Sequence, residues 1–390
     1  MNWKQYYKKL NTLPYVDFPK FDKNSLFDQR KSFYNSICLN EKNFRNKTFM
    51  EIGPGSGYNA FYLLAQDIKK IYLVDINDEA IKSCKKNLKK FKKKIKFIKK
   101  DVSRLNINKK FDYVIIENFI VVVDYPEKVL KKLLFYVKPN GYLIITTADE
   151  FSLFSDKLRG LIGHIVITQP NIIDKSYLFK RDLLCKIFNS HLKSLNLKTR
   201  KITSWVEDNV LSHKTATNKN YFPIDKITSI LSSNSKLNEY VIWKSSPDFN
   251  VDFTWYKKRN IRLLNLIFKK NYLKNIINTI HHNEKFLNYQ IRNYKKIIQN
   301  IKTINSKINA IKENNNLSPA QIKKIVYELK KLSKKFSFIK RKNAISNSLN
   351  EIILFLNFFI KKNKINTKYF RNFKNFWGNG HYSVAIFKSK

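Results

Sequence analysis

A glutamate and three glycines alternate with other residues in the segment "FMEIGPGSGYN". Glu51 is followed by Gly53, Gly55 and Gly57, although the whole chain of 390 residues contains only 8 glycines. Glycine adopts positive φ angles, and it lets a ligand approach the backbone without a Cβ atom in the way. A glycine-rich turn between a strand and a helix is typical of sites that bind the anionic or ribose-bearing part of a cofactor. The spacing therefore predicts a cofactor-binding turn.

Acidic residues also end the strands that we expect next along the chain. Asp75 lies in "YLVDIN", Asp101 in "FIKKDVSRL", and Glu117 with Asn118 in "YVIIENF". Open α/β sheets bind ligands at the carboxyl ends of their strands, and an acid about 20 residues after the glycine turn binds ribose hydroxyls. Each signal alone also fits a tight turn or a helix cap. Their coincidence at four strand ends favours a cofactor site.

The elements that would position these residues alternate between strand and helix. Short apolar runs alternate with amphipathic segments and short loops between residues 47 and 147, which is typical of an α/β fold with a doubly wound, parallel sheet. We expect strands at 48–52, 70–76, 95–101, 111–118 and 142–147, and helices at 58–68, 78–91 and 126–137.

The acid-x-Gly-x-Gly-x-Gly turn resembles the first motif of the class I S-adenosylmethionine-dependent methyltransferases. The resemblance implies a Rossmann-like, mostly parallel seven-stranded sheet, with "YVIWKSSP" and "HYSVAIF" as the sixth and seventh strands, and S-adenosyl-L-methionine as the cofactor. It also implies that Glu51 faces the cofactor's ammonium, that Asp75 binds the ribose and that Asp101 lies near the adenine. The implied cofactor-binding residues are Glu51, Gly53, Pro54, Gly55, Gly57, Asp75, Ile76, Asp101, Val102, Glu117 and Asn118.

Other parts of the chain argue against several alternative reactions and acceptors, but they do not identify the methyl acceptor. Tyr58 stands where GxGxxG would have its last glycine, so NAD-dependent oxidoreduction is a remote alternative. The segment "ENFIVVVDYP" lacks the Pro-Pro pair of exocyclic amino methyltransferases of nucleic acids, and no Pro-Cys nucleophile is present. Segments 191–211, 245–258 and 378–387 are similar to parts of a bacterial methyltransferase family of unassigned acceptor.

We expect methyl transfer by in-line attack to a small-molecule or sugar-type acceptor. The alternatives are an RNA methyltransferase that holds the polyanion with the basic helices of 257–376, and a noncatalytic scaffold that binds the cofactor. A general base would help transfer to a hydroxyl acceptor. For this role we favour His191 and Asp208, with Trp205 and Asn209 beside them. Further candidate bases are His213 and His381. The rings of Trp205, Trp243 and Trp255 would stack on a sugar or anchor the cap to the core.

The chain has a formal net charge of +47, which points to RNA or an anionic membrane surface as a partner. Only 11 of its 76 basic residues are arginines, so an AT-rich genome is the plainer explanation. The cysteines Cys38, Cys84 and Cys185 have no metal-binding or disulfide spacing, and no apolar run reaches the ~18 residues of a membrane span. We expect a cytoplasmic protein with reduced thiols and without a bound metal.

The pattern predicts five parts. They are an N-terminal helical segment (1–46), the cofactor-binding core (47–150), an acceptor-side cap with the sixth strand (151–256), a basic all-α insertion (257–376) and the final strand (377–390) at the edge of the sheet. The insertion has 29 basic and four acidic residues, a capping box at Ser318 and a long apolar stripe at 287–311 that would permit a dimer seam.

Overall fold

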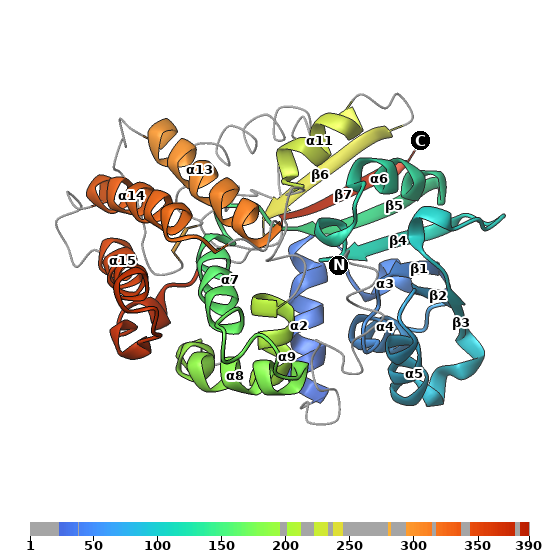
Figure 1. The fold of residues 1–390 in the computed structure, drawn as a ribbon. Helices are drawn as coiled ribbons and strands as arrows, with labels where there is room; N and C mark the ends of the chain where they lie inside the picture. Colours follow the sequence, from blue (N-terminus) through green and yellow to red (C-terminus); the bar gives the residue numbers. More distant parts are fainter. Residues whose placement is uncertain are drawn as a thin grey trace. The chain divides into compact units, whose positions relative to one another are not determined.

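The structure is a computed structural model that describes ten segments of the chain. They are residues 23–37, 39–195, 201–211, 222–232, 237–244, 280–281, 294–313, 317–336, 344–378 and 383–389. The chain divides into two compact units (Figure 1). The first, which we call the sheet unit, comprises 1–149, 220–274 and 381–390, and the second, the helical unit, comprises 150–219 and 275–380. This division differs from the expected one, because it distributes the cap 151–256 over both units.

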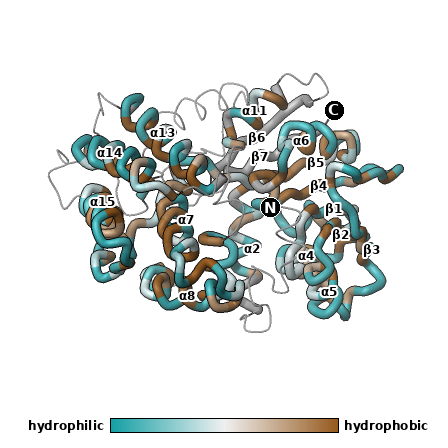
Figure 2. The backbone as a smooth tube through the Cα atoms, viewed as in Figure 1, coloured by the Kyte–Doolittle hydropathy of each residue, from teal (hydrophilic) through white to brown (hydrophobic). Residues whose placement is uncertain are grey.

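One sheet runs through the sheet unit in the order β3-β2-β1-β4-β5-β7-β6. The strands β1 to β5 are mutually parallel, which confirms the expected parallel core, whereas β7 is antiparallel to both β5 and β6. The central strands are almost completely buried and hydrophobic (Figure 2), as parallel strands covered on both faces must be. The strands are β1 (Thr48–Ile52), β2 (Lys70–Asp75), β3 (Ile95–Lys99), β4 (Phe111–Glu117), β5 (Val137–Thr147), β6 (Leu237–Lys244) and β7 (Ser383–Ser389).

Helices cover both faces of this sheet, as the handedness of the crossovers requires. The helices α4 (Tyr58–Ala65) and α5 (Asp78–Asn87) lie on one face and α6 (Pro126–Phe135) on the other (Figure 1). Helix α2 (Lys23–Ser36) packs against α4, and α11 (Ile224–Ser232) contacts β6 and β7. The order of the strands reverses between β1 and β4, so the loops after these strands lead away from each other. Such a switch point leaves a crevice at the carboxyl edge of the sheet.

The last strand of the chain does not lie at the edge. Strand β7 pairs with β5 on one side, where Ile144 faces Ile386, and with β6 on the other, where Val241 faces Ile386. The expectation of an edge position for 377–390 is therefore wrong, and β6 forms that edge of the sheet. The strand is apolar at Val384, Ala385, Ile386 and Phe387, which is typical of a strand with partners on both sides.

The helical unit is built from helices that are far apart in the chain. Long helices are α7 (Phe154–Ile167), α8 (Tyr177–Ser194), α13 (Tyr294–Glu313), α14 (Pro319–Phe336) and α15 (Ala344–Lys362). Shorter turns are α9 (Ile202–Val206), η5 (Glu207–Leu211), η8 (Thr367–Tyr369) and η9 (Phe373–Asn375). Helix α13 packs against both α7 and α14. None of the helices that the structure describes is long and apolar enough to cross a membrane.

Two expectations for the basic helices can be compared with this unit. The capping box is present, because Gln321 N donates to Ser318 Oγ at 3.2 Å and Ser318 N donates to Gln321 Oε1 at 3.3 Å. The dimer seam is not available on α13, since Ile301, Ile308 and Ile311 are buried within the chain itself. The residues before Tyr294 in that stripe lie outside the described residues.

Candidate functional site

The glycine turn joins β1 to α4 through three residues with positive φ. Gly53, Gly55 and Gly57 have φ angles of 68°, 58° and 84°, and Gly57 is the N-cap of α4. A Cβ on Gly53 would lie 2.8 Å from Cδ2 of Phe119, and one on Gly57 would lie 3.2 Å from Sγ of Cys84. Protein side chains thus already fill the space beside these two glycines. Their backbone angles and packing require glycine there, and the expectation that a missing Cβ makes room for a ligand does not apply to Gly53 and Gly57.

The acids Glu51, Asp75 and Asp101 lie at or just after the carboxyl ends of the adjacent strands β1, β2 and β3, and all three are buried. Gly53 N donates to Val74 O at 2.9 Å, which ties the glycine turn to the end of β2. Asp75 Oδ1 accepts from Asn77 N at 2.9 Å, and burial raises the pKa of Asp75 to about 6. Buried carboxylates aligned at one sheet edge can accept hydrogen bonds from several parts of one ligand.

Glu117, at the end of β4, is held by an arginine that sequence reasoning missed. Arg30 of α2 donates to both carboxylate oxygens of Glu117, at 2.9 and 2.8 Å. Its Nη2 also donates to Asn59 Oδ1 at 2.6 Å, and Tyr34 Oη donates to the same oxygen at 2.7 Å. Burial works against the guanidinium charge, but the Glu117 carboxylate raises the pKa of Arg30. Glu117 is therefore bound in a bidentate ion pair, a geometry specific to arginine.

The hydrogen bonds of Arg30 and Asn59 continue to Glu51, the acid that precedes the glycines. Asn59 Nδ2 donates to Glu51 Oε1 at 3.2 Å, whereas Glu51 Oε2 has no hydrogen-bond partner among the described residues. Burial, with the charge of Glu117 added, raises the pKa of Glu51 to about 7. A buried acceptor without a partner costs about 1–3 kcal/mol. A cationic or hydrogen-donating ligand would therefore gain by binding to this oxygen.

Asn118 follows β4 in a left-handed conformation, with a φ of 56°. Its backbone N donates to Thr146 Oγ1 at 2.8 Å, and its side-chain Oδ1 accepts from that hydroxyl at 2.9 Å. Asn118 thus holds the turn that directs the chain away from β1. Its role as a cofactor ligand stays a prediction, as do the roles of Pro54, Ile76 and Gly55.

A cavity of about 210 Å³ begins at the predicted adenine-side residues. Asp101 and Val102 form one wall, and residues of the loop after β4 and of α6 form the other. Asp101 Oδ1 accepts from Ser103 N at 2.9 Å, which fixes the turn after β3. Sequence reasoning missed the opposite wall, which consists of Val123, Asp124, Tyr125, Lys128, Val129 and Lys132. The cavity lies at the carboxyl edge of the sheet, between the end of β3 and helix α6, within the sheet unit.

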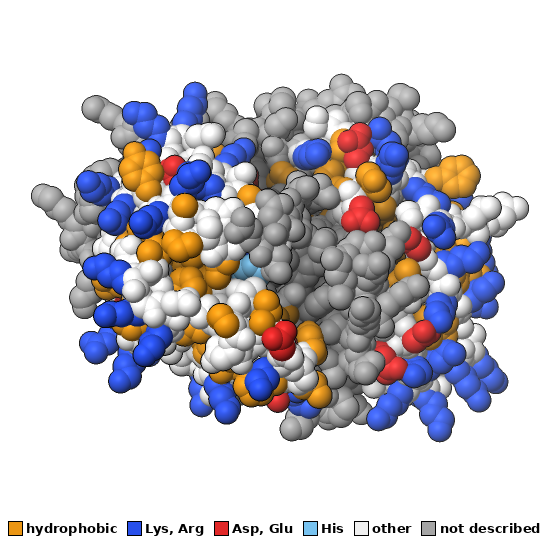
Figure 3. Space-filling model, in the orientation of Figure 1, with side chains coloured by type: hydrophobic (Ala, Val, Ile, Leu, Met, Phe, Trp, Pro, Cys, Tyr) orange, Lys and Arg blue, Asp and Glu red, His pale blue; other side chains and the backbone are white. Residues whose placement is uncertain are grey.

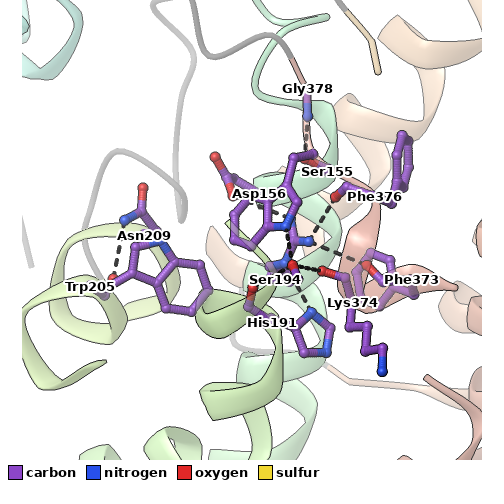
Figure 4. A network of polar contacts seen from close by, with 12 residues as sticks. Ser155, Asp156, His191, Ser194, Trp205, Asn209, Phe373, Lys374, Phe376 and Gly378 are labelled. Atoms are coloured by element: carbon purple, nitrogen blue, oxygen red, sulfur yellow. Dashed lines mark hydrogen bonds and ion pairs between the residues drawn. The ribbon is translucent and has the colours of Figure 1, made fainter. Parts of the chain in front are cut away.

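The two predicted general bases belong to the helical unit. His191 of α8 has no exposed surface, and its Nδ1 accepts from Arg159 Nε at 3.2 Å (Figure 4). Burial, with the positive charge of Arg159 added, lowers the pKa of His191 well below its usual value. A ring in this position is an internal hydrogen-bond acceptor, so the structure gives no support to His191 as a base. Asp208 is half-buried in η5, and its role stays a prediction.

Arg159 is completely buried. It donates to the carbonyl oxygen of Phe376 at 2.7 Å, lies 3.4 Å from Asp156, and stacks its guanidinium 3.6 Å from the ring centre of Trp377. Trp205 packs edge-on against Trp377 within the helical unit, with the ring centres 5.6 Å apart. An anchoring role of Trp205 between the cap and the core stays a prediction. Asn209 Nδ2 donates to Trp205 O. His213, His381, Trp255 and the side chain of Trp243 lie outside the described residues.

Comparisons with known proteins find similarity over about a third of the chain. Residues 43–171 match a sequence model of a methyltransferase domain. An uncharacterized protein of Methanocaldococcus jannaschii is 31% identical over 144 residues, which are 36% of this chain and 60% of that protein. The match thus covers less than two thirds of the length of that relative.

Solved structures with a similar core include two described as methyltransferases. The N-methyltransferase NodS of Bradyrhizobium japonicum WM9, in complex with S-adenosyl-L-homocysteine, is 17% identical with a TM-score of 0.31, over 38% of this chain and 75% of that one. An S-adenosylmethionine-dependent methyltransferase of Clostridium acetobutylicum is 22% identical with a TM-score of 0.28, over 35% and 54%.

Proposed function

We propose that the chain is an S-adenosylmethionine-dependent methyltransferase that acts on a small-molecule or sugar-type acceptor. The observation that carries the proposal is the row of buried acids Glu51, Asp75 and Asp101 at the carboxyl ends of adjacent parallel strands, next to a turn of three glycines with positive φ. The matching methyltransferase domain at 43–171 supports it. Open sheets of this order bind nucleoside-containing ligands at that edge.

The residues present fit this cofactor. Glu51 Oε2 is buried without a partner, which suits an ammonium group. Asp75 is a buried carboxylate that accepts a hydrogen bond from Asn77 N, and a carboxylate can accept from two vicinal ribose hydroxyls. The cavity beside Asp101 and Val102 would accommodate the adenine.

When bound, S-adenosyl-L-methionine supplies a methyl group that its sulfonium already activates. The chain's own residues therefore have to hold and orient the cofactor, and they have to align an acceptor opposite the methyl group. Glu51 would fix the amino-acid end and Asp75 the nucleoside end. Asp208 is the general base that we still propose for a hydroxyl acceptor, because His191 is buried and already accepts a hydrogen bond from Arg159.

The acceptor class rests on the sequence after β4. The segment 118–126 reads "NFIVVVDYP" and has no Pro-Pro pair, which disfavours methylation of an exocyclic amino group of a base. A small or sugar-type acceptor remains the better supported class. Incubation of the protein with radiolabelled cofactor and with candidate sugars, small molecules or structured RNA tests this. Label transferred only to RNA would contradict the proposed acceptor.

Calorimetry with S-adenosyl-L-homocysteine tests the cofactor site. We expect D75A to weaken binding by one to two orders of magnitude, because a lost hydrogen bond to a charged group is worth about 1.5–3 kcal/mol. The matched control is D78A, which removes an exposed acid from the same loop and helix and should bind normally. Absence of binding by the wild type, or equal affinity of D75A and wild type, would refute the assignment. Binding without turnover on any acceptor would favour the noncatalytic scaffold.

A further inference from the structure

Residues 82–100 form the most basic segment of the described chain. They include 11 lysines in 19 positions and contain no arginine, aspartate or glutamate. The whole chain has 65 lysines in 390 residues, about one in six, so this segment is enriched more than threefold. A genome-wide compositional bias would spread lysine evenly, and it does not account for a local excess of this size.

The segment lies on the sheet unit and not on the basic helices of 257–376. It covers most of α5, the 3-10 turn η2 (Lys89–Lys94) and the outermost strand β3. All of its lysines are exposed except Lys94, which is half-buried. Lysine and arginine side chains gather over α5 and β3 on the face seen in Figure 3. We call this surface the lysine edge.

Most lysines of the lysine edge form no ion pair with an acid of the described residues. Three of its lysines pair with acids, Lys82 with Glu79, Lys94 with Asp67 and Lys99 with Asp78, and no acid of the described chain pairs with the others. Like charges three or four positions apart on a helix are destabilising. An external negative partner would offset this repulsion.

We propose that the lysine edge is a docking surface for an anionic lipid bilayer. Several lysines near such a surface each contribute about 1 kcal/mol, and clusters of four to eight are typical of membrane-surface binding. The segment lacks arginine, whose planar guanidinium is the preferred group for bidentate binding of nucleic-acid phosphates. Charge complementarity without directional recognition is what a bilayer surface requires.

The aromatic rings of this surface also favour a bilayer over a nucleic acid. Single-stranded nucleic acids stack their bases on bare aromatic rings. Here lysine amines lie over the rings: Lys90 is 4.8 Å from the centre of Phe91, Lys85 is 5.7 Å from Phe97 and Lys96 is 5.6 Å from Tyr72. Phe91 and Phe97 are only partly exposed. Rings covered in this way do not offer a stacking platform.

Co-sedimentation with vesicles tests the proposal, using vesicles of phosphatidylcholine alone or with about 30% phosphatidylserine in about 0.15 M salt. The test variant K89Q/K90Q/K92Q/K93Q removes four charges from η2. The control K323Q/K324Q/K330Q/K334Q removes four exposed lysines from α14, so the net charge of both variants is the same. We expect the wild type and the control to bind only the anionic vesicles, and the test variant to bind them at least tenfold more weakly.

Three results would overturn the proposal. The first is no binding of the wild type to anionic vesicles. The second is an equal loss in both variants, which would indicate an effect of net charge. The third is binding of an oligouridylate, but not of vesicles, that depends on the four lysines of η2. Thermal unfolding of both variants shows whether they fold. If the test variant does not fold, the single variants K89Q and K93Q replace it, and their combined loss should exceed that of K323Q and K334Q.

Discussion

The proton on Glu51 should control the affinity for the cofactor. Burial and the charge of Glu117 raise the pKa of Glu51 to about 7, so its ionised fraction falls from roughly three quarters at pH 7.5 to roughly 3% at pH 5.5. An ammonium binds the carboxylate and not the protonated acid. Protonation of Glu51 alone should therefore weaken the binding of S-adenosyl-L-homocysteine roughly 25-fold when the pH is lowered from 7.5 to 5.5. Asp75, whose pKa is about 6, should add roughly a factor of four.

Calorimetry at pH 5.5, 6.5 and 7.5 in two buffers of different ionisation enthalpy measures both the affinity and the protons released. We expect about half a proton to be released from Glu51 near pH 7. In E51Q, only the fourfold dependence that belongs to Asp75 should remain. An affinity of the wild type that does not change with pH, or an undiminished pH dependence in E51Q, would refute the reasoning.

The raised pKa of Glu51 makes a separate prediction for the protein without cofactor. The native state keeps the proton on Glu51 up to about pH 7, whereas the unfolded state releases it near pH 4.5. The free energy of unfolding should therefore fall as the pH rises through this window. Chemical denaturation of the wild type and E51Q at pH 5 and pH 7.5 measures this, and E51Q should lose that part of the dependence.

Three further predictions concern residues with defined contacts. R30A should lower the free energy of unfolding by about 2–4 kcal/mol, because it leaves Glu117 without its bidentate partner, and R30K should recover only part of this in urea denaturation. G53A should destabilise the fold by about 1–3 kcal/mol, since its φ of 68° and the nearby Phe119 ring both oppose a Cβ; equal stability of G53A and wild type would contradict the turn geometry. The pKa of His191 is lowered in the native state, so below about pH 6.5 the unfolded state binds a proton that the native state does not. The helical unit should therefore lose stability as the pH falls below this value. Circular dichroism melts should show a weaker pH dependence for H191Q than for the wild type.

The parallel core was predictable because its signals are local. The segment "TFMEI" matches β1 residue for residue, and the other expected strands of the core overlap β2 to β5. The buried strands β1, β2 and β4 are short apolar runs, and each ends at the glycine turn or at an acid. The pairing of β7 with both β5 and β6 was not predictable in this way, because β6 and β5 are distant from β7 in the sequence and no local signal specifies which strands pair.

Arg30, the partner of Glu117, could not be predicted from the sequence. It lies 87 positions before Glu117, in a helix whose pattern shows only an apolar face. Nothing in its neighbourhood marks it as different from the other basic residues of so cationic a chain. The one usable signal was its type, since arginine is rare here and an isolated arginine near a predicted acidic edge is a candidate partner.

The prediction that His191 is a general base failed for the opposite reason. A histidine side chain suggests acid–base catalysis, but the surroundings of this one exclude it. Histidine titrates near neutral pH, so any lone histidine in a presumed acceptor-side segment is a candidate base. In the structure its ring lies among Phe188, Phe370 and Phe373 and accepts a hydrogen bond from Arg159. A buried arginine needs acceptors, and a neutral histidine is one that adds no charge of its own. The residue therefore stabilises the helical unit by staying unprotonated, which is a structural role for the property that suggested catalysis.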